Sequence, residues 1–121
     1  LAEDGDMLSP GTALLAPGGK QMILERSKVR IVDGDGRVNY RPCVDITFAS
    51  AAKYFSSKAL GIVLTGMGSD GRDGAKLMKE NGASIWAQDE KTCVIYGMPM
   101  AIVKAKLANA IFNSGMPVAA V

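Results

Sequence analysis

The spacing of apolar residues changes along the chain. Residues 20–32 contain two short runs, KQMILE and KVRIV, that predict two short strands. In KVRIV the polar residues Lys28 and Arg30 alternate with Val29 and Ile31, and this period of two predicts a half-buried strand. The DGDG that follows predicts a turn, because glycine accepts a positive φ and aspartate tolerates one. The earlier apolar run TALLA, residues 12–16, predicts another short buried strand that ends at PGG. Residues 12–32 are therefore expected to form a small antiparallel unit.

From Val44 onward the apolar period becomes helical. The residues that recur at this spacing are Val44, Phe48, Ala52 and Phe55. The pattern then predicts a strand over 60–64, a helix over 71–81 with Leu77 and Met78 facing inward, a strand over 84–87, a helix over 100–107 and a last strand over 109–112. Such alternation is typical of a parallel sheet with helices on its faces. The expected fold class is α/β, with an antiparallel excursion near the N-terminus.

Composition narrows the possible partners. The net charge of +2 and the lack of a Lys/Arg cluster argue against nucleic acid. No apolar run approaches the roughly 20 residues of a membrane helix, so no membrane insertion is expected. Cys43 and Cys93 fit no metal or redox spacing, and both are expected to be reduced and packed in a cytoplasmic protein. The chain contains no histidine, so it lacks the commonest general base and cannot complete a Ser-His-Asp site alone.

The stretch GIVLTGMGSDGRDG carries the candidate chemistry. Its glycines Gly66, Gly68 and Gly71 form G-x-G-x-x-G between a predicted strand and a predicted helix, which is the dinucleotide-binding fingerprint. Asp70 argues against a bound pyrophosphate, because its carboxylate would cap the following helix and repel a second anion. Asp70 is then either a simple helix cap or an aspartate that orients a catalytic histidine. The local sequence does not separate these two readings.

At VLTGMGSDGRDGAKLMKENGA and AQDEKTCVIYGMP the chain resembles the catalytic domain of the chemotaxis protein-glutamate methylesterases (CheB). The resemblance extends through SPGTALLAPGGKQMIL and NYRPCVDITFASAA and covers residues 1–112. It implies a doubly wound, mostly parallel α/β fold with a Ser-His-Asp triad. The enzymes of this family hydrolyse glutamyl methyl esters on chemotaxis receptors and deamidate receptor glutamines. No cofactor is implied.

The resemblance places Asp70 at the triad aspartate and the backbone N–H of Met67 in the oxyanion hole. Gly66, Gly68 and Gly71 shape the loop, and Ser69 receives no nucleophilic role. The family's serine and histidine precede the matched region, as does a phosphorylatable receiver domain. The chain, residues 1–121, is therefore expected to be the C-terminal portion of a methylesterase domain, inactive alone and open to self-association through an uncovered strand edge. The alternative is a non-catalytic module that binds receptors or regulators.

Overall fold

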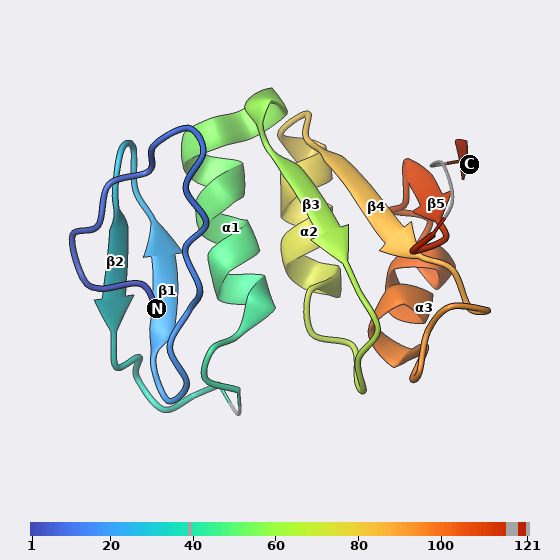
Figure 1. Cartoon of the computed structure of the whole chain (residues 1–121), viewed down its shortest axis with the longest axis horizontal. Coiled ribbons are helices and arrows are strands. Elements are labelled where there is room, and N and C mark those ends of the chain that lie inside the picture. The colour runs from blue at the N-terminus through green and yellow to red at the C-terminus, as the bar shows by residue number, and fades with distance from the viewer. Residues whose placement is uncertain (39, 116–118, 121) are drawn as a thin grey trace.

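The structure is a computed structural model that describes residues 1–38, 40–115 and 119–120. Helix α1 stands between a β-hairpin and a larger sheet (Figure 1). In chain order the elements are β1 (Gln21–Leu24), β2 (Val29–Val32), α1 (Val44–Phe55), the 3-10 helix η1 (Ser56–Lys58), β3 (Leu60–Val63), α2 (Arg72–Glu80), β4 (Ser84–Gln88), α3 (Gly97–Lys104), β5 (Ala110–Phe112) and β6 (Ala119–Ala120).

Strands β1 and β2 form the predicted antiparallel unit, with Leu24 opposite Val29. The strand predicted over residues 12–16 is wrong: these residues are outside any strand, and Leu15 is 68% exposed. The backbone of Val29 is instead paired with an earlier segment. The Gly5 N–H donates to the Val29 carbonyl (2.8 Å), and the Val29 N–H donates to the Asp6 carbonyl (2.9 Å). Residues 5 and 6, and not the TALLA run, thus pair with the hairpin at Val29, and the Leu15 carbonyl accepts the N–H of Ala2 (2.8 Å).

The larger sheet has the order β3-β4-β5-β6. Strands β3, β4 and β5 are parallel, and β6 pairs antiparallel with β5. This arrangement, with the separate hairpin, confirms the predicted α/β class and its antiparallel excursion. Helix α3 begins three residues earlier than predicted, at Gly97, because Pro99 fits into a first turn whose N–H groups have no intrahelical acceptor.

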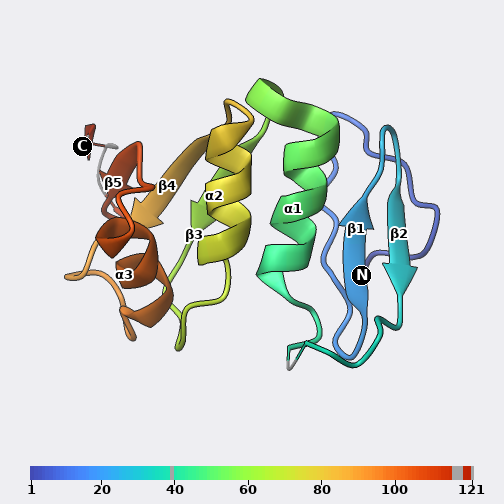
Figure 2. The same ribbon diagram turned by 180° about the vertical axis from the view of Figure 1, so that it is seen from behind.

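Helices α2 and α3 cover one face of this sheet, and α1 stands beside α2, between it and the hairpin (Figure 2). Alternate residues of β3 therefore have different surroundings. Gly61 and Val63 are buried against the helices, whereas Leu60 and Ile62 on the other face are each 45% exposed. None of the described helices has the length and hydropathy needed to cross a membrane.

The core lies between the sheet and the helices. Its buried members are Ala51, Ala52, Val63, Ala75, Met78, Ala83, Ile85, Ala87 and Ile102. Met78 is inward as predicted (1% exposed), but the same prediction for Leu77 is wrong, since that side chain is 44% exposed. One residue rotates a helix by about 100°, so a stripe through Ala75 and Met78 leaves Leu77 at its margin.

Candidate functional site

The loop TGMGSDG leaves β3 at its carboxyl end and leads into α2. Its first residues are fixed to the last residue of β4 and to the chain beyond it. Thr65 donates its backbone N–H to Gln88 Oε1 (2.8 Å), and Gly66 donates its N–H to the Ile95 carbonyl (3.0 Å). The Met98 N–H in turn donates to the Gly66 carbonyl (2.9 Å). The loop is therefore held in place by the strand end and by the first turn of α3.

Glycine is needed in this loop for two reasons. Gly68 and Gly71 have φ angles of +93° and +99°, in the left-handed region that residues with side chains rarely adopt. At Gly66 a β-carbon would lie 2.6 Å from Met98 Sδ, so the Met98 side chain would have to move to admit it. A β-carbon on Gly97 would likewise lie 3.0 Å from the Gly66 carbonyl oxygen. This contact explains physically why the TGMG and GMP motifs, distant in sequence, occur together.

The carboxylate of Asp70 accepts three hydrogen bonds from the start of α1. Its Oδ2 accepts the N–H of Val44 (2.8 Å), and its Oδ1 accepts the N–H of Asp45 (3.0 Å). The thiol of Cys43 also donates to Oδ1, with an Sγ–Oδ1 distance of 3.3 Å. The first N–H groups of a helix lack intrahelical acceptors and form its positive end. The carboxylate of Asp70 is therefore bound by donors at the start of α1.

Asp70 thus does not cap the helix that follows it, and that reading of the sequence is wrong. The N-cap residue of α2 is Gly71, which has no side chain that could accept a hydrogen bond from the first N–H groups of the helix. Asp45 caps α2 instead: its Oδ1 accepts the N–H groups of Gly71 (3.0 Å) and Gly74 (2.8 Å). The two aspartates therefore cap each other's helices, an arrangement that we call the reciprocal cap.

The reciprocal cap contradicts the dinucleotide interpretation. The N–H groups at the start of α2 are those that a G-x-G-x-x-G loop would offer to a pyrophosphate. Two of them already donate to Asp45. The negative charges of Asp45 and Asp70 would also repel a phosphate at this point. The chain therefore matches the G-x-G-x-x-G pattern, but the N–H groups of Gly71 and Gly74 are not free to bind a phosphate.

Cys43, Asp45 and Asp70 place their ligand atoms within 4.8 Å of one another, a spacing compatible with a metal ion. Both oxygens of Asp70 and Oδ1 of Asp45 already accept N–H or S–H groups, so the reciprocal cap accounts for the cluster. Burial raises the pKa of Asp45. The Gly74 N–H opposes this rise, and the charge of Asp70 adds to it. Cys43 and Cys93 are both free, as predicted.

Met67 and Ser69 lie on the exposed part of the loop. The side chain of Met67 is 79% exposed. Within residues 1–38 and 40–115, no group accepts a hydrogen bond from its backbone N–H. Ser69 is exposed, and its carbonyl accepts the N–H of Arg72 (3.2 Å). The Met67 N–H is thus available to an acceptor from outside these residues.

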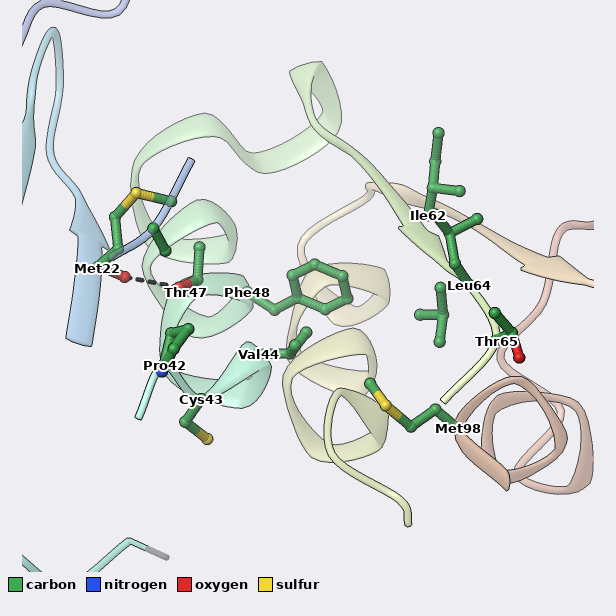
Figure 3. Close-up of a pocket in the computed structure, with 12 residues that line it drawn as sticks. Met22, Pro42, Cys43, Val44, Thr47, Phe48, Ile62, Leu64, Thr65 and Met98 are labelled. Atoms are coloured by element: carbon green, nitrogen blue, oxygen red, sulfur yellow. Dashed lines mark hydrogen bonds between the residues drawn. The ribbon is translucent and has the colours of Figure 1, made fainter. Parts of the chain in front are cut away.

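An apolar pocket of about 360 Å³ lies between α1 and β3 (Figure 3). Phe48 and Val44 of α1 line one side, and Ile62 and Leu64 line the other. The remaining lining residues are Ala16, Met22, Pro42, Cys43, Thr47, Val63, Thr65 and Met98. Because Cys43 and Val44 also bind Asp70, the pocket borders the reciprocal cap.

The sequence pattern identifies Asp70 but not the parts played by Asp45 and Cys43. One signal in the sequence does point to them. Helix α1 begins after Cys43, which makes no capping bond, where Ser, Thr, Asp or Asn would be preferred. The free N–H groups of α1 therefore need an acceptor from elsewhere in the fold. Only the tertiary structure shows that Asp70 is that acceptor.

Comparisons with known proteins agree with this geometry. The CheB methylesterase family model matches residues 1–118. The chain is 66% identical over 113 residues to the protein-glutamate methylesterase/protein-glutamine glutaminase of group 1 operon of Pseudomonas putida, covering 93% of this chain and 30% of that protein. A Pseudomonas aeruginosa protein-glutamate methylesterase/protein-glutamine glutaminase is 65% identical over 113 residues, with 93% of this chain and 31% of that protein covered.

Among solved structures, the Thermotoga maritima CheB methylesterase catalytic domain superposes with a TM-score of 0.89 at 35% identity. The match covers 93% of this chain and 61% of that one. The chain therefore spans about a third of the length of the Pseudomonas relatives and over half of the solved domain. The family model, the sequence identity and the fold agree, and the chain belongs to the CheB methylesterase family.

Proposed function

We propose that this chain supplies the triad aspartate, Asp70, of a protein-glutamate methylesterase that also deamidates protein glutamines. The substrates proposed are chemotaxis receptors, whose glutamyl methyl esters and glutamines are both converted to glutamate. The chain has no histidine, so the histidine and the nucleophilic serine would come from other residues of the complete protein. The related Pseudomonas proteins, about three times as long as this chain, have room for both.

The observation that carries the proposal is the setting of the Asp70 carboxylate. It lies beyond the carboxyl end of a parallel strand, where α/β folds place their sites. Three donors, two N–H groups of α1 and the thiol of Cys43 just before it, fix its orientation. An ionised carboxylate has about four acceptor positions, so one remains for the N–H of an imidazole. A fixed, partly satisfied carboxylate is what is needed to hold a histidine in one tautomer.

The chemistry is then an acyl transfer in two steps. The serine oxygen attacks the ester carbonyl while the histidine takes its proton, and the histidine returns that proton to the departing methanol. Water hydrolyses the acyl-serine in the same way. Asp70 stabilises the imidazolium in both steps, and the free N–H of Met67 would bind the oxyanion. With a glutamine, ammonia leaves in place of methanol.

The apolar pocket supports the idea that other residues of the complete protein pack beside Asp70. Ile62 of β3 and Leu64, which directly follows this strand, line it and remain about half-exposed, and β3 is an edge strand of the described sheet. More than a third of the T. maritima domain lies outside the match. We propose that the corresponding part of the complete protein covers this face and brings the serine and histidine to the reciprocal cap. A receiver domain and a cytoplasmic location belong to the same proposal.

A chimera tests this function. In it, the present chain replaces the matching 113-residue segment of the P. putida relative. We expect the chimera to release methanol from a methylated receptor and the chain alone to release none. A correctly folded chimera without activity would contradict the proposal. If it still bound the receptor, the non-catalytic binding module would be the better description.

We also propose that the chain alone self-associates through β3. Residues 60–64, LGIVL, carry no charge or proline, which are the usual protections of an edge strand. Sedimentation velocity should show dimers or larger species, and Ile62→Lys should shift the distribution toward monomer. Val94→Lys is the matched control, because Val94 is also exposed (90%) but lies outside the strands. A wild-type chain that is monomeric at every concentration tested would exclude this self-association.

A further inference from the structure

We infer that Cys43 is a positioning residue for Asp70: its thiol donates a hydrogen bond that helps to fix the carboxylate in the orientation that a histidine requires. This inference rests on the proposed function and adds to it a residue that the triad does not include. Cys43 touches no reacting atom in this scheme and acts through Asp70 alone.

The geometry places the thiol where it limits the carboxylate. The Cys43 Sγ lies 3.3 Å from Asp70 Oδ1, the oxygen that also accepts the Asp45 N–H at 3.0 Å. Oδ2 accepts only the Val44 N–H within the described residues. Oδ1 therefore accepts two hydrogen bonds and Oδ2 accepts one, so the free acceptor position is on Oδ2. A histidine would then meet one defined oxygen.

The reciprocal cap prevents this arrangement from shifting. The Cys43 N–H donates to Gln21 Oε1 (2.8 Å), which ties the residue to β1. On the opposite side, Asp45 Oδ1 binds Gly71 and Gly74 and fixes the start of α2, directly after Asp70. The donor and the acceptor of the thiol bond are thus each held by separate parts of the fold.

The thiol also keeps its proton. Cys43 is 3% exposed. Burial raises the pKa of the thiol, the Ile46 N–H opposes this, and the Asp70 carboxylate adds to the rise. A protonated thiol donates to a carboxylate, whereas a thiolate would repel it. At neutral pH Cys43 is therefore a hydrogen-bond donor and a poor nucleophile.

The hydrogen bond can be tested in the chain itself, without activity. In a Cys93→Ser background, Cys43 gives the single S–H stretching band of the Raman spectrum, and a strong acceptor lowers its frequency. Asp70→Asn should raise the frequency, because a neutral amide oxygen accepts more weakly than a carboxylate. Asp73→Asn, the same change on an exposed side chain, should leave the band in place. A band that does not respond to Asp70→Asn overturns the inference.

The positioning role is tested in the chimera. Cys43→Ala should lower kcat/KM about fivefold, the effect of one weak hydrogen bond. It should also move the acidic limb of the pH profile upward by roughly 0.5 unit, because a carboxylate with fewer donors stabilises the imidazolium more strongly. Cys43→Ser, whose hydroxyl donates, should restore both values.

A purely structural role of Cys43 gives a different result. Activity would then fall in Cys43→Ala with no shift of the acidic limb, and Cys43→Ser would not restore it; either finding overturns the inference. The two experiments can also give different results. If Asp70→Asn shifts the Raman band but does not change the activity of the chimera, the hydrogen bond exists and the proposed function is wrong. The positioning role of Cys43 is then wrong as well, because it depends on that function. The two proposals are therefore separated by their readouts.

Discussion

Asp70→Asn in the chimera should lower kcat for methyl-ester hydrolysis by up to about 10⁴-fold. An asparagine keeps one acceptor oxygen but places an NH₂ group where the carboxylate has its second oxygen. That NH₂ would face the N–H of Val44 or the donors at Oδ1, where it can accept nothing. The histidine would lose the partner that selects its tautomer and stabilises its charge. Release of methanol under saturating substrate measures the effect.

The matched control is Asp73→Asn, which removes the same charge three residues later. The Asp73 side chain is 76% exposed and pairs only with the neighbouring Arg72 in the described structure. Its replacement should change kcat by less than about twofold. Circular dichroism of both variants shows whether the fold is kept. If folded Asp70→Asn keeps more than about a tenth of the wild-type rate, Asp70 is not the triad aspartate.

Gly74→Ala should reduce the free energy of unfolding by about 2–3 kcal/mol, although alanine is the better helix former. A β-carbon at this position would lie 2.6 Å from Phe48 Cβ and 2.9 Å from the backbone of Asp45. Helices α1 and α2 would have to move apart, and the hydrogen bonds from Gly71 and Gly74 to Asp45 would lengthen. This loss exceeds the gain of about 1 kcal/mol in helix propensity. Urea unfolding of the chain measures the net change.

Gly18→Ala provides the comparison. A β-carbon there meets no atom within 4 Å, and Gly18 does not have a positive φ. The substitution should alter stability by less than about 0.5 kcal/mol. If the Gly74→Ala chain is as stable as the wild type, the prediction is wrong, and α1 and α2 can move apart without a loss of stability. In the chimera, that result would also predict normal activity for Gly74→Ala.

Both predictions depend on the contact between α1 and α2, and this contact could not be predicted from the sequence. Phe48 and Gly74 fit the apolar periods of their own helices, but neither period says which helix is the neighbour. The small residue at 74 is a weak clue to close packing. Its meaning follows only when Asp45 and Phe48 are found against it.

Elements with a strong local pattern could be predicted from the sequence. The alternation over 28–32, the helical period from Val44 and the apolar runs over 60–64 and 84–87 all correspond to observed elements, because these signals depend on near neighbours in the chain. The strand predicted over 12–16 is wrong, since a strand needs a strand partner and it is residues 5 and 6 that pair with Val29 of the hairpin. The choice of partner is a long-range property that no local pattern contains.

The same division holds at the candidate site. The motif TGMGSDG identified Asp70, and positive φ angles at Gly68 and Gly71 are a property that glycine itself makes possible. Which helix Asp70 caps was decided only by the tertiary structure. The hydrogen bonds from Val44 and Asp45 to Asp70 join residues more than twenty positions apart. They can form only after α1 and α2 have packed against each other. The sequence supplies the carboxylate, and the packing of two helices decides what it holds.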